Sequence, residues 1–285
     1  MTSIASLHIY PLKGGRGLSL DQVELDRFGP KNDRRWMVIE ADGSFVTQRE
    51  IPALCQIGAV PSNSGVTLSA PNLEPLVLAR PAPDSPTRRV AIWDDETDGV
   101  ELGPVAADWI SQALGASLRL IYLPDHALRR TNPEYDPIGA RVSFADGYPI
   151  LVISEASLED LNRRLEVPLP MNRFRPNLVV RGSTPFAEDR WRVFSAGGIR
   201  FEGLKLCARC PVTTTDQATG ARGKEPLRTL ASFRKHADGV MFGMNVAHRG
   251  SGTLRVGDPI AVEETGTVPN DRPVAPRSVP PEGVR

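Results

Sequence analysis

Cysteine is scarce in this sequence, and the scarcity limits the chemistry that the chain can support. Its 285 residues include 3 cysteines, Cys55, Cys207 and Cys210, and so small and odd a number argues against a disulfide scaffold. A four-cysteine iron–sulfur cluster needs more thiolates than the chain contains. We therefore expect no iron–sulfur cluster in this chain, so any electrons that it uses must arrive from elsewhere.

Neither one sign of charge nor long apolar stretches dominate the sequence. Lys and Arg number 34, as do Asp and Glu, so nothing in the net charge suggests nucleic acid or a membrane surface as a partner. No apolar run reaches the roughly 18 residues of a transmembrane helix, and the start MTSIASLHIYPLKGG does not resemble a signal peptide. We expect a cytoplasmic monomer that acts on a small molecule.

Short strand patterns fill the first hundred residues. Stretches such as SIASLHIY, GVTLSA and RVAIWDD are separated by turn residues, and Asp42-Gly43 lies between two apolar runs as in a β-hairpin. Helices are expected at 104–115, at 154–165 with Ser154 as N-cap, and at 226–236. Most of the remaining apolar segments, including 212–216 (VTTTD), are typical of strands. The pattern predicts a mixed α and β fold that is rich in strands.

Two segments have little periodicity. Residues 126–148 hold many turn formers, which favours a long surface loop of the kind that is often functional. The chain from Thr267 onward contains five prolines and almost nothing apolar to bury, so we expect the tail at 265–285 to be disordered.

The closest pair of cysteines, Cys207-Ala-Arg-Cys210, allows three interpretations. A structural zinc site wants four Cys or His ligands, but the four histidines are scattered and no second CxxC exists. A thioredoxin-like dithiol belongs at a helix N-terminus, whereas the residues after Cys210 are β-branched. Two ordinary cysteines in a half-buried strand are the simplest interpretation of this pattern alone.

Basic residues recur in three further segments. YPLKGGRG at 10–17 could present backbone N–H groups and Lys13 to an anion, although an ordinary basic turn is as good an interpretation. Arg34 and Arg35 adjoin a strand, so one of them faces the core and needs an anionic partner. Arg173 and Arg175 are expected on one face of an extended stretch. Together with a thiolate, these cations would suit a phosphorylated, metal-bearing cofactor.

The ordered set of motifs resembles a known family. IASLHIYPLKGGRG, FGPKNDRRWMVIEADGSFVTQRE, SFADGYPILVISEASLEDLN, NRFRPNLVV, CARCPVTTTDQATG, KEPLRTL and LRVGDPI are similar to MOSC proteins with an N-terminal β-barrel domain, as in the YcbX-type bacterial proteins and the mitochondrial amidoxime-reducing component. The resemblance implies an N-terminal MOSC β-barrel domain at 1–100, a MOSC β-barrel domain with a few helices at 101–264, and the tail at 265–285.

The resemblance also implies a molybdenum cofactor between the two domains. The metal-ligating cysteine of the family falls on Cys210, and the residues that contact the pterin phosphate side fall on Lys13 and Arg34. Other cofactor contacts are implied for Gly14, Gly147, Tyr148, Arg175, Asn177, Ala208 and Arg209. Gly14 stands where relatives often have Ser, which removes one hydroxyl contact.

The implied activity is reduction of N-hydroxylated compounds (hydroxylamines, amidoximes or N-hydroxylated bases) by oxygen-atom abstraction at molybdenum. No ferredoxin-like segment follows the matched motifs, so a separate electron-donor protein is expected, of the ferredoxin or flavin and iron–sulfur reductase type. Asp216, six residues after Cys210 on an expected strand, is a candidate catalytic group or simply a turn residue. A molybdenum-cofactor or sulfur carrier without turnover and a non-catalytic scaffold are the alternatives.

Overall fold

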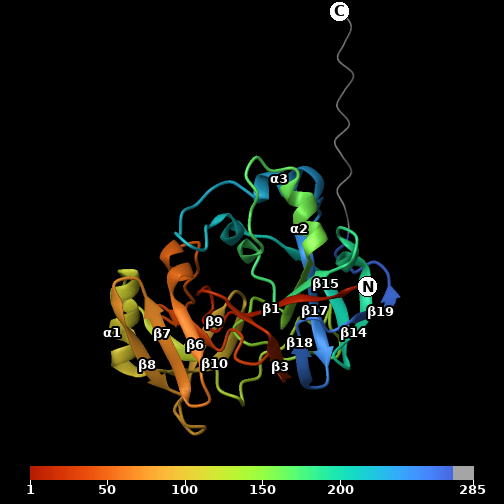
Figure 1. Cartoon of the computed structure of the whole chain (residues 1–285). Helices are drawn as coiled ribbons and strands as arrows, with labels where there is room; N and C mark the ends of the chain where they lie inside the picture. Colours follow the sequence, from red (N-terminus) through yellow and green to blue (C-terminus); the bar gives the residue numbers. More distant parts are fainter. Residues whose placement is uncertain (272–285) are drawn as a thin grey trace, which may run out of the picture.

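A nine-stranded sheet forms the larger half of the molecule. The computed structural model describes residues 1–271 (Figure 1). The sheet has the order β19-β14-β15-β17-β12-β13-β1-β2, with β16 paired to β17. Its strands are β1 (Ser3–Ile9), β2 (Leu18–Leu20), β12 (Ile150–Ser154), β13 (Leu178–Arg181), β14 (Trp191–Ala196), β15 (Ile199–Ala208), β16 (Lys235–His236), β17 (Gly239–Arg249) and β19 (Ile260–Thr265). Strands β12 and β13 run parallel and are joined through helix α2 (Glu155–Asn162).

Three smaller sheets accompany this large one. One has the order β5-β11-β10-β9, a second β6-β7-β8, and a third β18-β3-β4. Their strands are β3 (Gln22–Asp26), β4 (Gly29–Pro30), β5 (Trp36–Ile39), β6 (Gly58–Pro61), β7 (Gly65–Ala70), β8 (Leu73–Ala79), β9 (Arg88–Ile92), β10 (Asp95–Glu101), β11 (Arg119–Tyr122) and β18 (Gly252–Arg255). Figure 1 shows β6, β7 and β8 with helix α1 (Gly103–Leu114) on one side, and the large sheet with α2 and α3 (Leu227–Phe233) on the other. The prediction of a mixed fold rich in strands is confirmed.

Local sequence signals explain the helices. Helix α1 ends at Gly115, whose φ of 69° is left-handed and suits a residue without a side chain. The Ser154 hydroxyl caps α2 by accepting a hydrogen bond from the Ser157 N–H. The three α-helices of the described residues lie where they were expected, although α2 and α3 are shorter. Within the described residues 1–271, none of the helices is long and apolar enough to cross a membrane.

The first structural unit extends beyond residue 100. Strand β11 pairs with both β5 and β10, and Ile110 of helix α1 is buried in the same apolar cluster as Trp36 and Leu68. Helix α1 thus buries its apolar face against the N-terminal strands, while the division at 100 and 101 that the resemblance implied stays a prediction.

Two expected features are wrong in part. Residues 212–216 do not form a strand, because the turn Pro211–Thr214 is a 3-10 helix in which the Thr213 and Thr214 hydroxyls donate to backbone carbonyls of Cys210 and Pro211. The tail expected at 265–285 is packed at its beginning, since Val268 and Asn270 are 3% and 2% exposed. The rest of that prediction, for 272–285, lies outside the described residues.

The long segment 126–148 lacks helices and strands, as expected, but it is not confined to the surface. Phe144 and Asp136 are both completely buried. Asp136 accepts hydrogen bonds from the Thr131 hydroxyl and from the backbone N–H of Ala140, so the loop is braced from within. It delivers Asp146, Gly147 and Tyr148 to a cavity between the two halves of the molecule.

Candidate functional site

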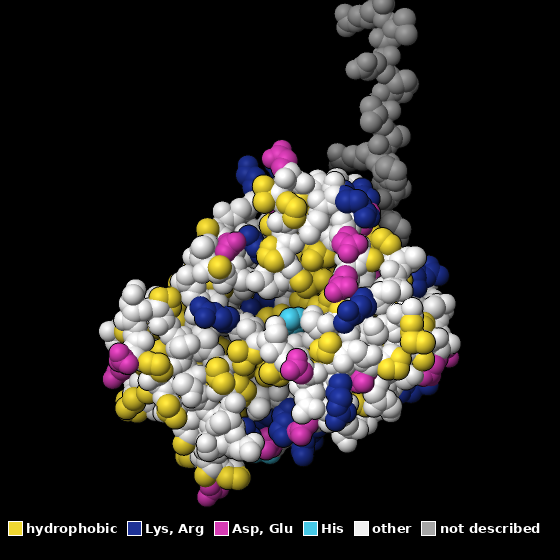
Figure 2. All heavy atoms as spheres, viewed as in Figure 1, with side chains coloured by type: hydrophobic (Ala, Val, Ile, Leu, Met, Phe, Trp, Pro, Cys, Tyr) yellow, Lys and Arg dark blue, Asp and Glu magenta, His cyan; other side chains and the backbone are white. Residues whose placement is uncertain are grey.

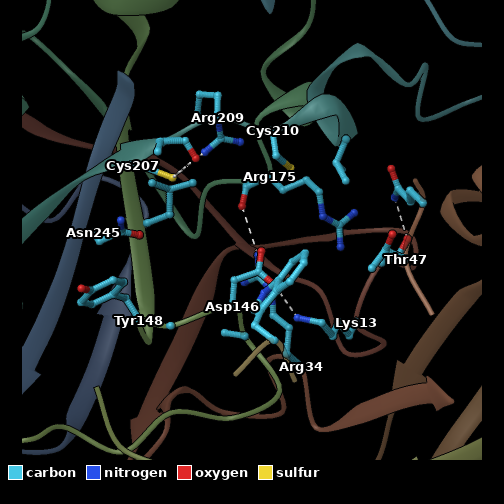
Figure 3. A pocket seen from close by; sticks show the side chains of 18 of the residues that line it. Lys13, Arg34, Thr47, Asp146, Tyr148, Arg175, Cys207, Arg209, Cys210 and Asn245 are labelled. Atoms are coloured by element: carbon cyan, nitrogen blue, oxygen red, sulfur yellow. Dashed lines mark hydrogen bonds and ion pairs between the residues drawn. The ribbon is translucent and has the colours of Figure 1, made fainter. Parts of the chain in front are cut away.

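A cavity of about 340 Å³ lies where the two halves meet (Figure 3). Its wall combines N-terminal segments, the end of the long loop, and strands β15 and β17. The lining residues are Lys13, Gly14, Arg34, Phe45, Val46, Thr47, Gln48, Arg49, Trp93, Ala145, Asp146, Gly147, Tyr148, Leu151, Phe174, Arg175, Lys205, Leu206, Cys207, Ala208, Arg209, Cys210, Val212 and Asn245. Nine of the ten residues that the family resemblance assigned to the cofactor are among them, Asn177 being the exception.

A buried lysine holds one end of the cavity. The Lys13 ammonium lies 2.5 Å from a carboxylate oxygen of Asp146 and donates to the Phe144 carbonyl oxygen at 2.8 Å. Burial lowers the pKa of Lys13, although Asp146 opposes this effect. Burial also disfavours the charged form of Asp146, but Lys13 and the Trp93 indole N–H outweigh it and hold the carboxyl pKa well below its usual range. Asp146 therefore carries its negative charge at neutral pH.

Arg34 lies beside this pair and is held from behind. Its guanidinium donates to the Asp33 carboxylate at 2.5 Å and to the Asn177 side-chain oxygen at 3.1 Å, and it stacks 4.3 Å from the centre of the Tyr10 ring. Asn177 is 2% exposed and does not line the cavity. In this structure Asn177 therefore positions Arg34.

Arg175 has a hydrogen-bond donor with no protein partner. One guanidinium nitrogen donates to the Gly15 carbonyl oxygen at 2.6 Å, whereas the other, Nη2, is buried without an acceptor. Burial, reinforced by the nearby positive charge of Arg34, lowers the pKa of Arg175 to about 10, so it remains charged at neutral pH. A buried donor of this kind costs free energy unless a ligand accepts from it.

The two cysteines form the opposite end of the cavity. Strand β15 carries Cys207, the chain leaves the strand at Ala208, and Cys210 immediately precedes the 3-10 turn. Both thiols are free and line the cavity. The Arg209 guanidinium lies 2.9 Å from the Cys207 sulfur and also donates to the Phe174 carbonyl oxygen at 2.6 Å, while its Nε is buried without a partner (Figure 3).

The described residues around these thiols do not form a zinc site. In the part of the chain that the structure describes, no group of three or more His, Cys, Asp or Glu side chains could hold a metal ion. A thioredoxin-like placement also fails, because the CxxC pair follows a strand and precedes only a short 3-10 turn.

Asp216 lies outside the cavity lining. Its carboxylate accepts hydrogen bonds from the backbone N–H groups of Ala218 and Thr219 and from the Arg173 guanidinium at 2.8 Å. Because the expected strand is absent, the spacing that would have aimed Asp216 toward Cys210 does not apply. The geometry favours a turn residue.

The side chains of Arg173 and Arg175 point to different places. The 3-10 turn η2 (Met171–Arg173) and the left-handed φ of 57° at Arg175 break the extended stretch that was expected there. Arg173 turns toward Asp216, and Arg175 turns into the cavity. Of the adjacent pair Arg34 and Arg35, Arg35 is buried and finds its anionic partner in Asp125 at 2.6 Å.

Several cavity residues were missed by sequence reasoning. Asp146 adjoins the predicted Gly147 and Tyr148 and could have been included on that ground. Trp93, Phe174 and Asn245 carry no sequence signal that separates them from ordinary strand or turn residues. Burial raises the pKa of the Tyr148 phenol, with further contributions from the nearby acidic groups, so this hydroxyl stays protonated at neutral pH.

Figure 2 shows no surface region dominated by one sign of charge on the face displayed. Lys and Arg side chains alternate there with Asp and Glu, as the zero net charge suggests. The unusual concentration of cations is instead inside the cavity, where Arg34, Arg175 and Arg209 approach from different segments.

Comparison with known proteins gives two consistent matches. The MOSC N-terminal beta barrel domain matches residues 1–117, and the MOSC domain matches residues 139–261. The chain is 36% identical over 276 residues to mitochondrial amidoxime-reducing component 1 of Mus musculus, which covers 90% of this chain and 81% of the relative. It is 33% identical over 276 residues to mitochondrial amidoxime-reducing component 1 of Homo sapiens, covering 90% and 82%.

Among solved structures, YiiM from Geobacillus stearothermophilus shares 14% identity over 41% of this chain and 55% of that one, with a TM-score of 0.33. The predicted cytoplasmic location is contradicted, because the relatives that match 90% of the chain are named as mitochondrial proteins. The chain belongs to the MOSC family with an N-terminal MOSC β-barrel domain, together with the mitochondrial amidoxime-reducing components.

Proposed function

We propose that this protein is a molybdenum-cofactor-dependent reductase of N-hydroxylated compounds such as amidoximes and hydroxylamines. The observation that carries the proposal is one cavity with two cysteine thiols at one end and buried, incompletely satisfied arginines around it. The names of relatives that are 30% to 36% identical to this chain supply the substrate class.

The residues present fit a phosphorylated pterin that carries molybdenum. Arg175 Nη2 and Arg209 Nε are buried donors without acceptors, and a ligand with phosphate or ring oxygen and nitrogen atoms would satisfy them. A side-chain carbon added at Gly147 would meet nothing within 4 Å, so this stretch of the wall leaves room for a ligand. A soft thiolate is a suitable ligand for the metal.

In this proposal each end of the cavity has its own task. Cys210 holds the metal, while Arg34 and Arg175 bind the anionic part of the cofactor; Lys13 contributes charge but is already engaged by Asp146. Asn177 fixes Arg34, and Arg209 fixes the Cys207 thiol. When bound, the cofactor supplies two-electron chemistry at a metal that takes the oxygen atom from an N–OH group.

The remaining cavity residues orient the substrate. Leu151 and Phe174 provide apolar wall, which limits access of water to the thiol end. The Tyr148 phenol keeps its proton at neutral pH and can donate a hydrogen bond to an N–O oxygen. We assign the supply of electrons to a separate donor protein, because 3 cysteines are too few for a four-cysteine iron–sulfur cluster.

The proposal is tested with protein made in a host that produces the cofactor. Wild type reduced chemically, without any partner protein, should convert a hydroxylamine or an amidoxime to the amine or amidine. Cys210→Ser should abolish turnover, whereas Arg173→Met, outside the cavity, should retain it. Bound molybdenum without turnover under reducing conditions would contradict the reductase proposal and would favour a cofactor carrier.

A further inference from the structure

The segment 266–271 packs against the strand that carries the cysteine motif, beyond the end of the MOSC match at residue 261. The side chains of Val268 and Asn270 are 3% and 2% exposed. Thr267, which precedes Val268, and Pro269, which lies between the two, are exposed. Pro269 and Asn270 lie in a turn that the Asp271 N–H closes by donating to the Val268 carbonyl oxygen, and this turn buries Val268 and Asn270 on one face. The buried face is directed at the large apolar cluster, in which Val268 and Leu206 both take part.

Asn270 replaces a missing neighbour of strand β15. On that edge, β14 pairs with β15 only from Ile199 to Glu202 and does not reach Leu206. The Asn270 side-chain oxygen accepts from the Leu206 N–H at 2.9 Å, and its amide nitrogen donates to the Leu206 carbonyl oxygen at 3.1 Å. One side chain thus satisfies both backbone groups of a completely buried residue, as a paired strand would.

The position of this contact relates it to the cavity. Leu206 lines the cavity, and the next residue is Cys207. On the other edge, the pairing of β15 with β17 shifts register between Leu206 and Ala208, so the ladder is irregular at the same point. The strand therefore has less backbone support where it approaches the thiols than over its first part.

Other contacts hold the segment in place. The Gly266 N–H donates to the Arg190 carbonyl oxygen at 2.9 Å, and the Asp271 N–H donates to the Val268 carbonyl oxygen at 3.0 Å. An Asp271 carboxylate oxygen lies 3.5 Å from Nδ1 of His236 on β16. The segment is thus attached at both ends, with Asn270 between the attachments.

We infer that Asn270 is a positioning residue for the cysteine motif, acting through the backbone of Leu206. That the motif holds a metal rests on the proposed function, whereas the contact between Asn270 and Leu206 does not. Asn270→Ala removes both hydrogen bonds and leaves a buried N–H and C=O without partners.

The test uses the full chain without metal, with Thr267→Ala as the matched exposed control. In Asn270→Ala, hydrogen exchange at the Leu206 amide should be about tenfold faster or more than in the control. Native alkylation of Cys207 and Cys210 should be several-fold faster, while the fully buried Cys55 stays protected. After cofactor loading, Asn270→Ala should retain several-fold less molybdenum per chain than Thr267→Ala.

Three results would overturn this inference. Exchange and alkylation equal to those of Thr267→Ala would show that Leu206 needs no support from Asn270. An equal rise at Cys55 would mean a global loss of structure in place of a local one. Unchanged molybdenum retention would deny the positioning role. Because exchange and alkylation are read without metal, a failure of the proposed function, seen as metal retention by Cys210→Ser, remains a separate result.

Discussion

Replacing Asp146 with Asn should weaken the fold through loss of the ion pair at the cationic end of the cavity. Lys13 is 7% exposed, so its ammonium depends on the carboxylate of Asp146 at 2.5 Å and on the Phe144 carbonyl. The Coulomb attraction at this distance of 2.5 Å is about 2 kcal/mol in water and about 7 kcal/mol at an effective dielectric constant of about 20. The Asp146 side chain is 71% exposed toward the cavity, so solvent screening favours the lower figure, and we expect a loss of about 1–2 kcal/mol at pH 7.

The effect should depend on pH in a defined direction. Because Asp146 has a lower carboxyl pKa in the folded chain than its usual value of 3.8, its contribution is complete above that value and is lost as the pH falls through the folded pKa. The difference between wild type and Asp146→Asn should therefore be constant from about pH 5 to 7 and shrink under acid conditions.

Urea unfolding of the two proteins at several pH values measures this difference. Glu24→Gln is the matched control, because Glu24 lies 2.5 Å from Lys31 but both side chains are about half exposed, at 60% and 48%. We expect the control to lose less than about 0.5 kcal/mol. Equal losses in the two variants, or a difference that persists unchanged in acid, would refute the reasoning.

Three further predictions concern burial, space and charge. Burial, partly offset by Arg234, raises the pKa of Asp189 to about 7, so the folded chain binds this proton more tightly than the unfolded chain does. The free energy of unfolding should therefore fall as the pH rises from about 4 to 7. In Asp189→Asn, the free energy of unfolding measured over this range should depend less on pH. A Cβ at Gly203 would lie 1.9 Å from the Trp191 carbonyl oxygen, whereas one at Gly147 meets nothing within 4 Å; Gly203→Ala should lower the melting temperature by many degrees and Gly147→Ala hardly at all. Arg175→Met should reduce cofactor retention about tenfold or more, measured as molybdenum per chain after dialysis, with Arg173→Met near wild type.

Local signals in the sequence predict the regular elements because the physics behind them is local. Ser154 caps α2 and Gly115 ends α1 through contacts within a few residues. The 3-10 turn after Cys210 was missed, because β-branched Thr213 and Thr214 favour a strand by propensity but here use their hydroxyls to bond nearby carbonyls. The competing local hydrogen bonds decided the structure.

Only the site residues that belong to sequence motifs could be predicted. Lys13, Arg34 and Cys210 followed from the resemblance, and the fold brings them to one cavity. Trp93, Lys205 and Asn245 come to that cavity through long-range packing, which a pattern along the chain does not encode. Asn270 was assigned to a tail with nothing to bury, because a single amide that completes a strand edge leaves no periodic signature.

The molybdenum content of Cys210→Ser tests the central claim most directly. Wild type, Cys207→Ser and Cys210→Ser would be made side by side in a cofactor-producing host, and molybdenum would be measured per folded chain. We predict near-stoichiometric metal in wild type, a smaller loss in Cys207→Ser, and loss of nearly all the metal in Cys210→Ser. Full retention by Cys210→Ser would contradict the assignment of this thiol as the metal ligand.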